Sequence, residues 1–387
     1  MRKLVGVVAL LLLTGLMFPA GAQERPELPC FWRPTSLTEP WLSADVPCME
    51  QVAWPPELDA GAFTSLAMSP DHVLYAASPL TGEVVRFTDE DGDGLPESPD
   101  AWLSGLVRPM ALAWWDDALY IYGGDTISRH TDDGLSVIVP DVPGDAVHAG
   151  GMAIGRLAGE PEARLYIGVN AACPSCETGL DTGGVILSYA LEGGEPVLVA
   201  NGLYRPTELA FWRGELYAVD TAPAAQNAAD PSALGADELN QIQPGGFYGF
   251  PECAAGSSCE GSIGPVYTLP YGTRPTGLAG YDGADMPALT GNLLLTLGGI
   301  DMGLDVAGYQ LAALDLETGL LRTLSPSPNL PGDPRYEALP TNELNWRGVG
   351  LYPLRPLDII VDDRGWAFIA LGSGRILAFR PQSEVVY

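Results

Sequence analysis

An aspartate-rich segment has the spacing of a calcium-binding loop. Its side-chain oxygens fall at loop positions 1, 3, 5, 9 and 12, from Asp89, Asp91, Asp93, Glu97 and Asp100. Gly94 stands at position 6, and the carbonyl of Leu95 would add an oxygen at position 7. This is the oxygen pattern of EF-hand-type calcium loops. The alternative is a solvated acidic turn. Because neighbouring carboxylates repel one another without a cation, the sequence favours a structural calcium ion.

A second segment, residues 237–251, combines acidic residues with a glycine-rich turn. It begins Asp237-Glu238-Leu239-Asn240 and ends Gly-Gly-Phe-Tyr-Gly-Phe-Pro, with Tyr248 in the aromatic part. Glycines and the proline fix such a turn against aromatic rings. We therefore expect an ordered acidic loop, in which Glu238 is a second candidate cation ligand.

Histidine is the side chain best suited to accept a hydroxyl proton near neutral pH. The chain has three histidines, at positions 72, 130 and 148. His72 lies in a predicted turn and His130 at a predicted strand end, which is typical of surface residues. No Gly-x-Ser-x-Gly, nucleotide-loop or metalloprotease motif is present.

The elements that would position these residues recur along the chain. Six segments combine a short apolar strand, a turn and a second strand, and they begin at Ser65, Ala111, Gly151, Glu208, Gly277 and Asp358. Arg-Pro precedes four of them, at Arg108-Pro109, Arg205-Pro206, Arg274-Pro275 and Arg355-Pro356. Proline suits the start of an innermost strand because it fixes φ and has no N–H to donate.

A strand–turn–strand unit cannot bury its faces alone, so its repetition predicts an all-β, six-bladed β-propeller. The alternative is a β-sandwich with chance similarity between its hairpins. We expect the propeller to span residues 56–387 and an N-terminal arm to span residues 23–55.

The first 22 residues read as a secretory signal peptide. Arg2 and Lys3 precede the apolar run 4–18, and Ala20-Gly21-Ala22 offers a cleavage site. A membrane anchor is the alternative, but the run is short for a bilayer span. We therefore expect a secreted or periplasmic protein with no stable membrane insertion after cleavage.

The six cysteines form three local pairs, Cys30/Cys48, Cys173/Cys176 and Cys253/Cys259. An even number in an exported chain favours disulfides, with local pairing the simplest of the possible connectivities. For Cys173-Pro-Ser-Cys176 the alternatives are a redox pair or half of a zinc site. No second such motif and no nearby histidine pair supports a metal site there.

The net charge of −30 excludes whole classes of partner. Such a surface repels nucleic-acid phosphates and anionic lipids. Lys3 is the only lysine, so a mature chain without the signal would have none.

The order of motifs resembles the soluble quinoprotein sugar dehydrogenases of the glucose/sorbosone dehydrogenase-like group. The resemblance covers about residues 60 to 380. It rests on the Asp-rich loop, the strand Leu-Tyr-Ala-Val-Asp ending at Asp220, the 237–251 segment, Gly-Tyr-Gln-Leu at Tyr309 and the last repeat. Members of the group are six-bladed propellers that bind pyrroloquinoline quinone (PQQ) and calcium at the channel mouth.

The resemblance implies roles for several residues. His148 would be the catalytic base, taking the proton of the sugar C1 hydroxyl, and Glu238 with the Tyr248 backbone would hold calcium. Tyr204-Arg205 stands where the group has Arg-Asn, and Arg205, Tyr204 and Arg274 become the cofactor-binding candidates. The four Arg-Pro arginines have a second interpretation, in which each pairs with a neighbouring carboxylate.

The leading hypothesis is a PQQ- and calcium-dependent oxidoreductase acting on a sugar or a related alcohol or aldehyde. One alternative is a propeller that has lost the quinone site and binds a carbohydrate or a protein. A weaker one is a lactonase-like hydrolase with calcium on the channel axis, for which Asn170, Glu208 and Asp220 are the candidate ligands.

Overall fold

The computed structural model describes residues 30, 33, 35–37, 42–43, 45–46, 48–53, 61–144, 149–223, 235–253, 256–270, 272–301, 306–327, 345 and 350–381. The predicted signal peptide and His148 lie outside these residues. Among them, no helix is long and apolar enough to cross a membrane.

The described residues form six main sheets, which confirms the predicted six-bladed propeller. Blade 1 consists of β2 (Ser65–Met68), β3 (Leu74–Ser78), β4 (Glu83–Thr88) and β5 (Ser98–Leu103). Blade 2 consists of β6 (Pro109–Trp115), β7 (Ala118–Gly123), β8 (Thr126–Thr131) and β9 (Gly134–Val139). Blade 3 consists of β10 (Ala149–Gly155), β11 (Arg164–Val169), β12 (Val185–Ala190), β13 (Gly193–Asn201) and the short β17 (Gly246–Phe247).

The other three blades follow the same plan. Blade 4 consists of β14 (Pro206–Trp212), β15 (Glu215–Asp220), β16 (Glu238–Gln241) and β18 (Tyr267–Thr268). Blade 5 consists of β19 (Pro275–Tyr281), β20 (Asn292–Leu297), β23 (Gln310–Asp315) and β24 (Leu320–Ser325), with the small hairpin β21 (Ile300–Asp301) and β22 (Val306–Ala307). Blade 6 consists of β25 (Pro356–Val361), β26 (Ala367–Leu371), β27 (Ile376–Phe379) and β1 (Met49–Ala53).

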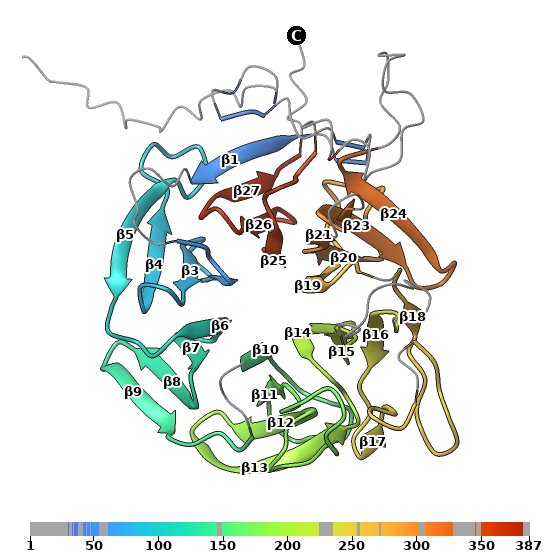
Figure 1. Cartoon of the computed structure of the whole chain (residues 1–387). Helices are drawn as coiled ribbons and strands as arrows, with labels where there is room; N and C mark the ends of the chain where they lie inside the picture. The colour runs from blue at the N-terminus through green and yellow to red at the C-terminus, as the bar shows by residue number, and fades with distance from the viewer. Residues whose placement is uncertain are drawn as a thin grey trace, which may run out of the picture.

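The six innermost strands, β2, β6, β10, β14, β19 and β25, surround the central channel (Figure 1). Glycine lets them approach closely. A Cβ at Gly151 would lie 2.3 Å from the Cα of Glu208, and one at Gly277 would lie 2.8 Å from the Cα of Asp358. Any side chain at these two positions would push neighbouring blades apart.

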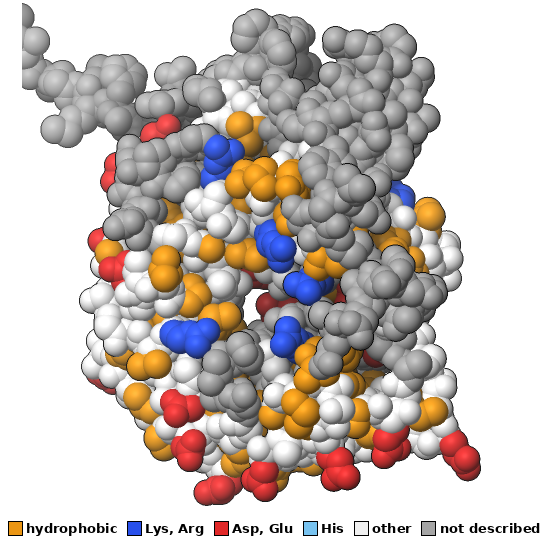
Figure 2. Space-filling view, in the orientation of Figure 1, with side chains coloured by type: hydrophobic (Ala, Val, Ile, Leu, Met, Phe, Trp, Pro, Cys, Tyr) orange, Lys and Arg blue, Asp and Glu red, His pale blue; other side chains and the backbone are white. Residues whose placement is uncertain are grey.

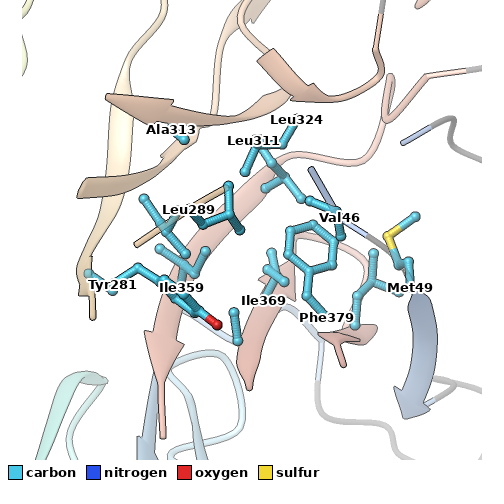
Figure 3. Packing of buried hydrophobic residues seen from close by; sticks show 14 of the residues in the cluster. Val46, Met49, Tyr281, Leu289, Leu311, Ala313, Leu324, Ile359, Ile369 and Phe379 are labelled. Atoms are coloured by element: carbon cyan, nitrogen blue, oxygen red, sulfur yellow. The ribbon is translucent and has the colours of Figure 1, made fainter. Parts of the chain in front are cut away.

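The hydrophobic core is divided among the interfaces between blades. Figure 3 shows the cluster between blades 5 and 6, in which Tyr281 and Leu311 pack toward Ile359 and Phe379. Strands such as β20 are buried along their whole length because a neighbouring blade covers each face, and such strands read as continuous apolar runs.

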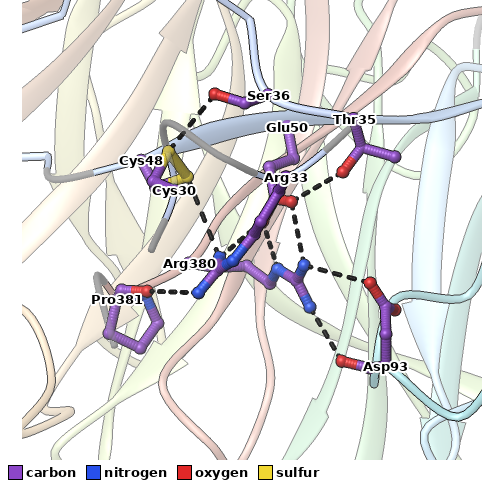
Figure 4. Close-up of a disulfide and its surroundings, with 9 residues drawn as sticks. All are labelled: Cys30, Arg33, Thr35, Ser36, Cys48, Glu50, Asp93, Arg380 and Pro381. Atoms are coloured by element: carbon purple, nitrogen blue, oxygen red, sulfur yellow. Dashed lines mark hydrogen bonds and ion pairs between the residues drawn. A yellow bond between two sulfur atoms is a disulfide. The ribbon is translucent and has the colours of Figure 1, made fainter. Parts of the chain in front are cut away.

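Blade 6 closes the ring with both ends of the chain. β1 pairs antiparallel with β27, with Met49 opposite Phe379. This strand falls inside the range 23–55 that the sequence assigns to the arm. Beside it, Arg380 forms ion pairs with Glu50 and, at 3.3 Å, with Asp93 (Figure 4). Burial acts to raise the pKa of Glu50, but hydrogen bonds from Arg380 and Thr35 lower it.

The three predicted local disulfides are present, Cys30–Cys48, Cys173–Cys176 and Cys253–Cys259. Cys30–Cys48 lies next to the Glu50 cluster (Figure 4) and ties the segment before β1 to it.

Candidate functional site

Arginines gather around one mouth of the channel. Arg108, Arg205, Arg274 and Arg355 each directly precede an innermost strand, so the fold brings all four to the same end of the ring. Figure 2 shows basic side chains around the central opening of this face, in contrast to the acidic outer rim. Arg108 and Arg205 are exposed, and Arg274 and Arg355 are half-buried.

Two of these arginines are held by tyrosine rings. The Arg205 guanidinium lies 5.0 Å from the ring centre of Tyr204, and that of Arg355 lies 5.4 Å from the ring centre of Tyr309. Within the described parts of the chain, none of the four guanidinium groups forms an ion pair with a carboxylate. Arg274 still interacts with a carboxylate at longer range, because burial raises the pKa of Asp237 and the charge of Arg274 acts against this.

A small acidic cavity lies beside Arg205. It has a volume of about 20 Å³, and its lining includes Tyr204, Asp220, Glu238, Tyr248 and Phe250. The register of β15 and β16 places Asp220 opposite Glu238. The space suits one ion or one water molecule.

Burial raises the pKa of both acids in this cavity. It raises the pKa of Asp220 to about 8, helped by the charge of Glu238 and opposed by the amides of Tyr204 and Arg205. Burial also raises the pKa of Glu238, although Asn240 and the amide of Gly256 donate to its carboxylate. The Asn240 side-chain oxygen is buried and has no hydrogen-bond partner.

These features fit a divalent cation bound by oxygen ligands. Two buried carboxyl groups with raised pKa values face a cavity of ionic size, and a third oxygen beside Glu238 lacks a donor. The neighbouring Asp237 is engaged differently. It accepts hydrogen bonds from the amides of Ala222 and Arg274, at 2.9 and 2.7 Å, and so fixes the backbone next to the mouth.

The aspartate-rich loop brings four of its predicted ligands together. Carboxylate oxygens of Asp89, Asp91, Asp93 and Glu97 lie within 4.8 Å of one another. The loop is also folded on itself, since Asp89 accepts from the amides of Gly92 and Gly94, at 2.7 and 2.8 Å. Burial is the main reason that the pKa of Glu97 is raised, and the charges of Asp89 and Asp91 add to it.

Asp100 lies outside this group. It belongs to β5, where its carboxylate pairs with Arg86 on β4 at 2.6 Å. The strand begins at Ser98, so position 12 of the loop pattern is extended along the sheet instead of folding back.

Two further buried acids lie on innermost strands two blades apart, and Asp358 accepts the amide of Leu66 at 2.6 Å. Glu208 on β14 and Asp358 on β25 occupy equivalent positions of their blades, with Gly277 of β19 between them. Burial raises the pKa of Asp358 to about 7, and burial together with the charge of Asp358 raises the pKa of Glu208 well above its usual value.

The axial calcium site of the lactonase alternative gains no support. Asp220 lines the small acidic cavity and Glu208 lies on β14, and no group of three or more His, Cys, Asp or Glu side chains in the described chain contains either. Asn170 is buried, and its side-chain oxygen has no partner.

His72 and His130 lie away from the arginine mouth. His72 is in the turn after β2, where its Nδ1 is 3.5 Å from a carboxylate oxygen of Asp363. His130 is on β8 with its ring 4.3 Å from that of Trp102, and burial lowers its pKa. Sequence reasoning missed Asp358 and gave Asp220 only an axial role. The sequence signal for the Asp220–Glu238 pair was Val-Asp at the end of one predicted strand, ending at Asp220, and Asp-Glu at the start of the 237–251 segment.

Comparison with known proteins identifies the fold. No protein-family model and no curated protein sequence matches the chain. Solved structures do. An aldose sugar dehydrogenase from Streptomyces coelicolor in its PQQ-bound form is 18% identical with a TM-score of 0.57, covering 85% of this chain and 96% of that one.

Two further solved structures extend the likeness. The apo-form of the soluble aldose sugar dehydrogenase from Escherichia coli is 16% identical, with a TM-score of 0.58 and coverage of 86% and 99%. A calcium structure of a carbohydrate-active enzyme of family AA12 from Trichoderma reesei is 14% identical, with a TM-score of 0.64 and coverage of 90% and 98%. At these identities the likeness shows that the chain shares the six-bladed propeller fold of these sugar dehydrogenases.

Proposed function

We propose that this chain is an exported oxidoreductase that uses PQQ and calcium to oxidise a sugar or a related alcohol or aldehyde. The arginine mouth is the observation that carries the proposal. Four guanidinium groups surround the channel opening without forming an ion pair with a carboxylate in the described chain, and two of them lie over tyrosine rings. A flat tricarboxylate such as PQQ matches such a site in charge and in its need for a stacking surface.

Within this mouth, Arg205 and Arg274 would bind the cofactor carboxylates, and Tyr204 would orient Arg205 through the observed ring contact. The exposure of Arg205 and the half-burial of Arg274 leave both within reach of a ligand. When bound, PQQ supplies the two-electron acceptor for the oxidation.

Calcium would occupy two places. Glu238, the Tyr248 carbonyl and Asp220 would hold one ion in the 20 Å³ cavity, where it would neutralise the buried carboxylates. Asp89, Asp91, Asp93, Glu97 and the Leu95 carbonyl would hold the other, in a structural role.

The register of the blades supports His148 as the base. In β10 the pairing register with the next strand shifts after the first residue, Ala149. A register shift also follows the first residue of four other innermost strands, which in each case is a proline: Pro109, Pro206, Pro275 and Pro356. His148 therefore directly precedes the β10 counterpart of those prolines, in the sequence place that an arginine takes in four other blades. Its imidazole would take the proton of the sugar hydroxyl.

The disulfides fit an oxidising compartment, which supports export through the predicted signal peptide.

The test is reconstitution. The purified protein, mixed with PQQ, Ca²⁺ and an aldose, should reduce an artificial electron-acceptor dye. His148→Ala should reduce kcat about 100-fold or more while PQQ binding remains, as expected for loss of a general base. His130→Ala is the matched control, because His130 lies on the outer part of blade 2, and it should retain activity.

Two results would contradict the proposal. Absence of PQQ binding at micromolar concentration would exclude PQQ as the cofactor and favour the alternative of a propeller that binds a carbohydrate or a protein. Retention of full activity in His148→Ala would show that His148 is not the catalytic base.

A further inference from the structure

A second and larger cavity opens at the opposite end of the channel. It has a volume of about 600 Å³ and is formed where β2, β6 and β25 end and enter their turns. The arginines precede the starts of innermost strands, so this cavity lies on the other face of the propeller. Its size is that of a small-molecule site.

The chemistry of this cavity differs from that of the arginine mouth. Its walls are apolar and aromatic, with Met68, Ala113, Trp114 and Trp115. Its charged lining residues are all acidic, namely Asp116, Asp362 and Asp363, and no Lys, Arg or His is among the lining residues. Such a surface disfavours phosphates, carboxylates and other anions.

The polar and aromatic groups are held in place. The Trp114 indole N–H donates to the carbonyl of Asp116 at 2.6 Å, and its ring stacks on Tyr75 with centres 5.2 Å apart. Asp362 accepts from the amide of Trp366 at 2.9 Å and pairs with Arg364 at 2.6 Å. A preorganised wall of this kind loses little entropy when a ligand binds.

The acceptor groups distinguish a neutral ligand from a cationic one. Asp362, the buried carboxylate of the cavity, is already neutralised by Arg364, and Asp116 and Asp363 are exposed to water. An organic cation would therefore find no desolvated, unpaired charge. Hydroxyl groups can still donate to the remaining lone pairs of these carboxylates and to Ser69.

We propose that this cavity is a binding site for a neutral pyranose oligosaccharide. Sugar rings have apolar C–H faces that pack on indole rings, and hydroxyls at their edges that donate to carboxylates. Trp115 is half-exposed and lines two neighbouring cavities as well, one of about 290 Å³ and one of about 660 Å³, so the binding surface continues beyond a single ring. The site binds sugar independently of catalysis at the arginine mouth.

The experiment uses the full protein labelled with 5-fluorotryptophan. Maltotriose and cellotriose are titrated and followed by ¹⁹F NMR, with choline and tri-galacturonate as the cationic and anionic comparators. One neutral trisaccharide should shift the Trp115 resonance, which is assigned from the Trp115→Phe variant. Trp115→Ala should weaken binding at this site by about tenfold or more, as isothermal titration calorimetry measures it.

Asp363→Asn is a second variant for the case that Trp115→Ala does not fold. Asp363 is exposed, so its replacement should leave the fold intact. Asp363→Asn should also weaken trisaccharide binding. Asp181→Asn, an exposed control on blade 3, should not. His148→Ala should bind normally at this site, which separates it from the proposed catalytic site. The proposal is overturned if neither neutral trisaccharide shifts the Trp115 resonance at millimolar concentration, if choline or tri-galacturonate binds more tightly, or if Asp363→Asn binds as the unmutated protein does.

Discussion

Asp220 accepts the backbone amide of Tyr204 with both carboxylate oxygens, at 2.9 and 3.2 Å. The same carboxylate accepts the amide of Arg205 and lines the small acidic cavity. Asp220 therefore links the proposed calcium ion to the part of the arginine mouth formed by Tyr204-Arg205.

Asp220→Asn should weaken both ligands. The amide keeps a similar shape but loses the negative charge and replaces an acceptor with a donor, which faces the amides of Tyr204 and Arg205. We expect Ca²⁺ affinity to fall about tenfold or more and PQQ affinity to fall with it, as measured by calorimetry with each ligand. Asp237→Asn is the comparison for Ca²⁺ affinity, which it should leave unchanged, because Asp237 does not line the small acidic cavity and accepts the amide of Arg274 instead. Unchanged Ca²⁺ affinity in Asp220→Asn would exclude Asp220 as a ligand.

The carboxyl groups of Glu208 and Asp358 predict a pH dependence of stability. The folded-state pKa of Asp358 is raised to about 7, and that of Glu208 is raised well above its usual value. The folded protein then holds protons that the unfolded chain releases near pH 4. The stability contribution is complete below that pH and is lost as the pH rises through about 7.

Glu208→Gln should remove part of the stability loss that occurs as the pH rises. Above pH 8 the variant should be more stable than the unmutated protein, by about 1 kcal/mol or more, and at pH 4 the two should be alike. Thermal unfolding from pH 4 to 9 at fixed Ca²⁺ measures the difference. Identical pH profiles would show that Glu208 does not titrate as part of the pair.

The aspartate-rich loop predicts a calcium-dependent gain in thermal stability. In a Glu238→Gln background, which removes the other proposed calcium site, Asp91→Asn should abolish the rise in Tm on adding Ca²⁺, because it removes one of four converging carboxylates. Asp100→Asn should retain the rise, since Asp100 pairs with Arg86. Differential scanning fluorimetry with and without a chelator compares the two variants. A retained rise in Asp91→Asn, with the other cation cavity disabled by Glu238→Gln, would show that this loop binds no calcium.

The buried ion pair of blade 6 predicts a large loss of stability on mutation. Arg380 is 2% exposed and Glu50 is fully buried, so Arg380→Ala leaves a buried carboxylate with less compensation. The expected cost is about 3–5 kcal/mol in the free energy of unfolding by urea. Arg213→Ala removes an exposed arginine paired with Asp282, and should cost much less, because water screens an exposed ion pair. Equal costs in the two variants would mean that burial does not control the strength of these pairs.

The fold was predictable because every blade repeats one local pattern. The Arg-Pro sequences mark the starts of four innermost strands, and the hairpins that follow them need only neighbouring residues to form. The disulfides were predictable for the same reason, since each joins cysteines close in sequence.

Features that depend on distant residues were not predictable. The pairing of β1 with β27 joins strands more than 300 residues apart, so no pattern of neighbouring residues indicates it. The charge of Asp358 acts on Glu208 only once their blades are assembled in the ring. The sequence pattern also extended the calcium loop to Asp100, because spacing alone does not show where β5 begins.

The pairing of Met49–Ala53 with Ile376–Phe379 also constrains biosynthesis. The ribosome makes one edge of blade 6 well before the rest of it, so β1 has no partner until β27 has been translated. Contacts of such sequence separation form slowly. The ring therefore stays open at blade 6 until residues 376–379 are available to pair with β1.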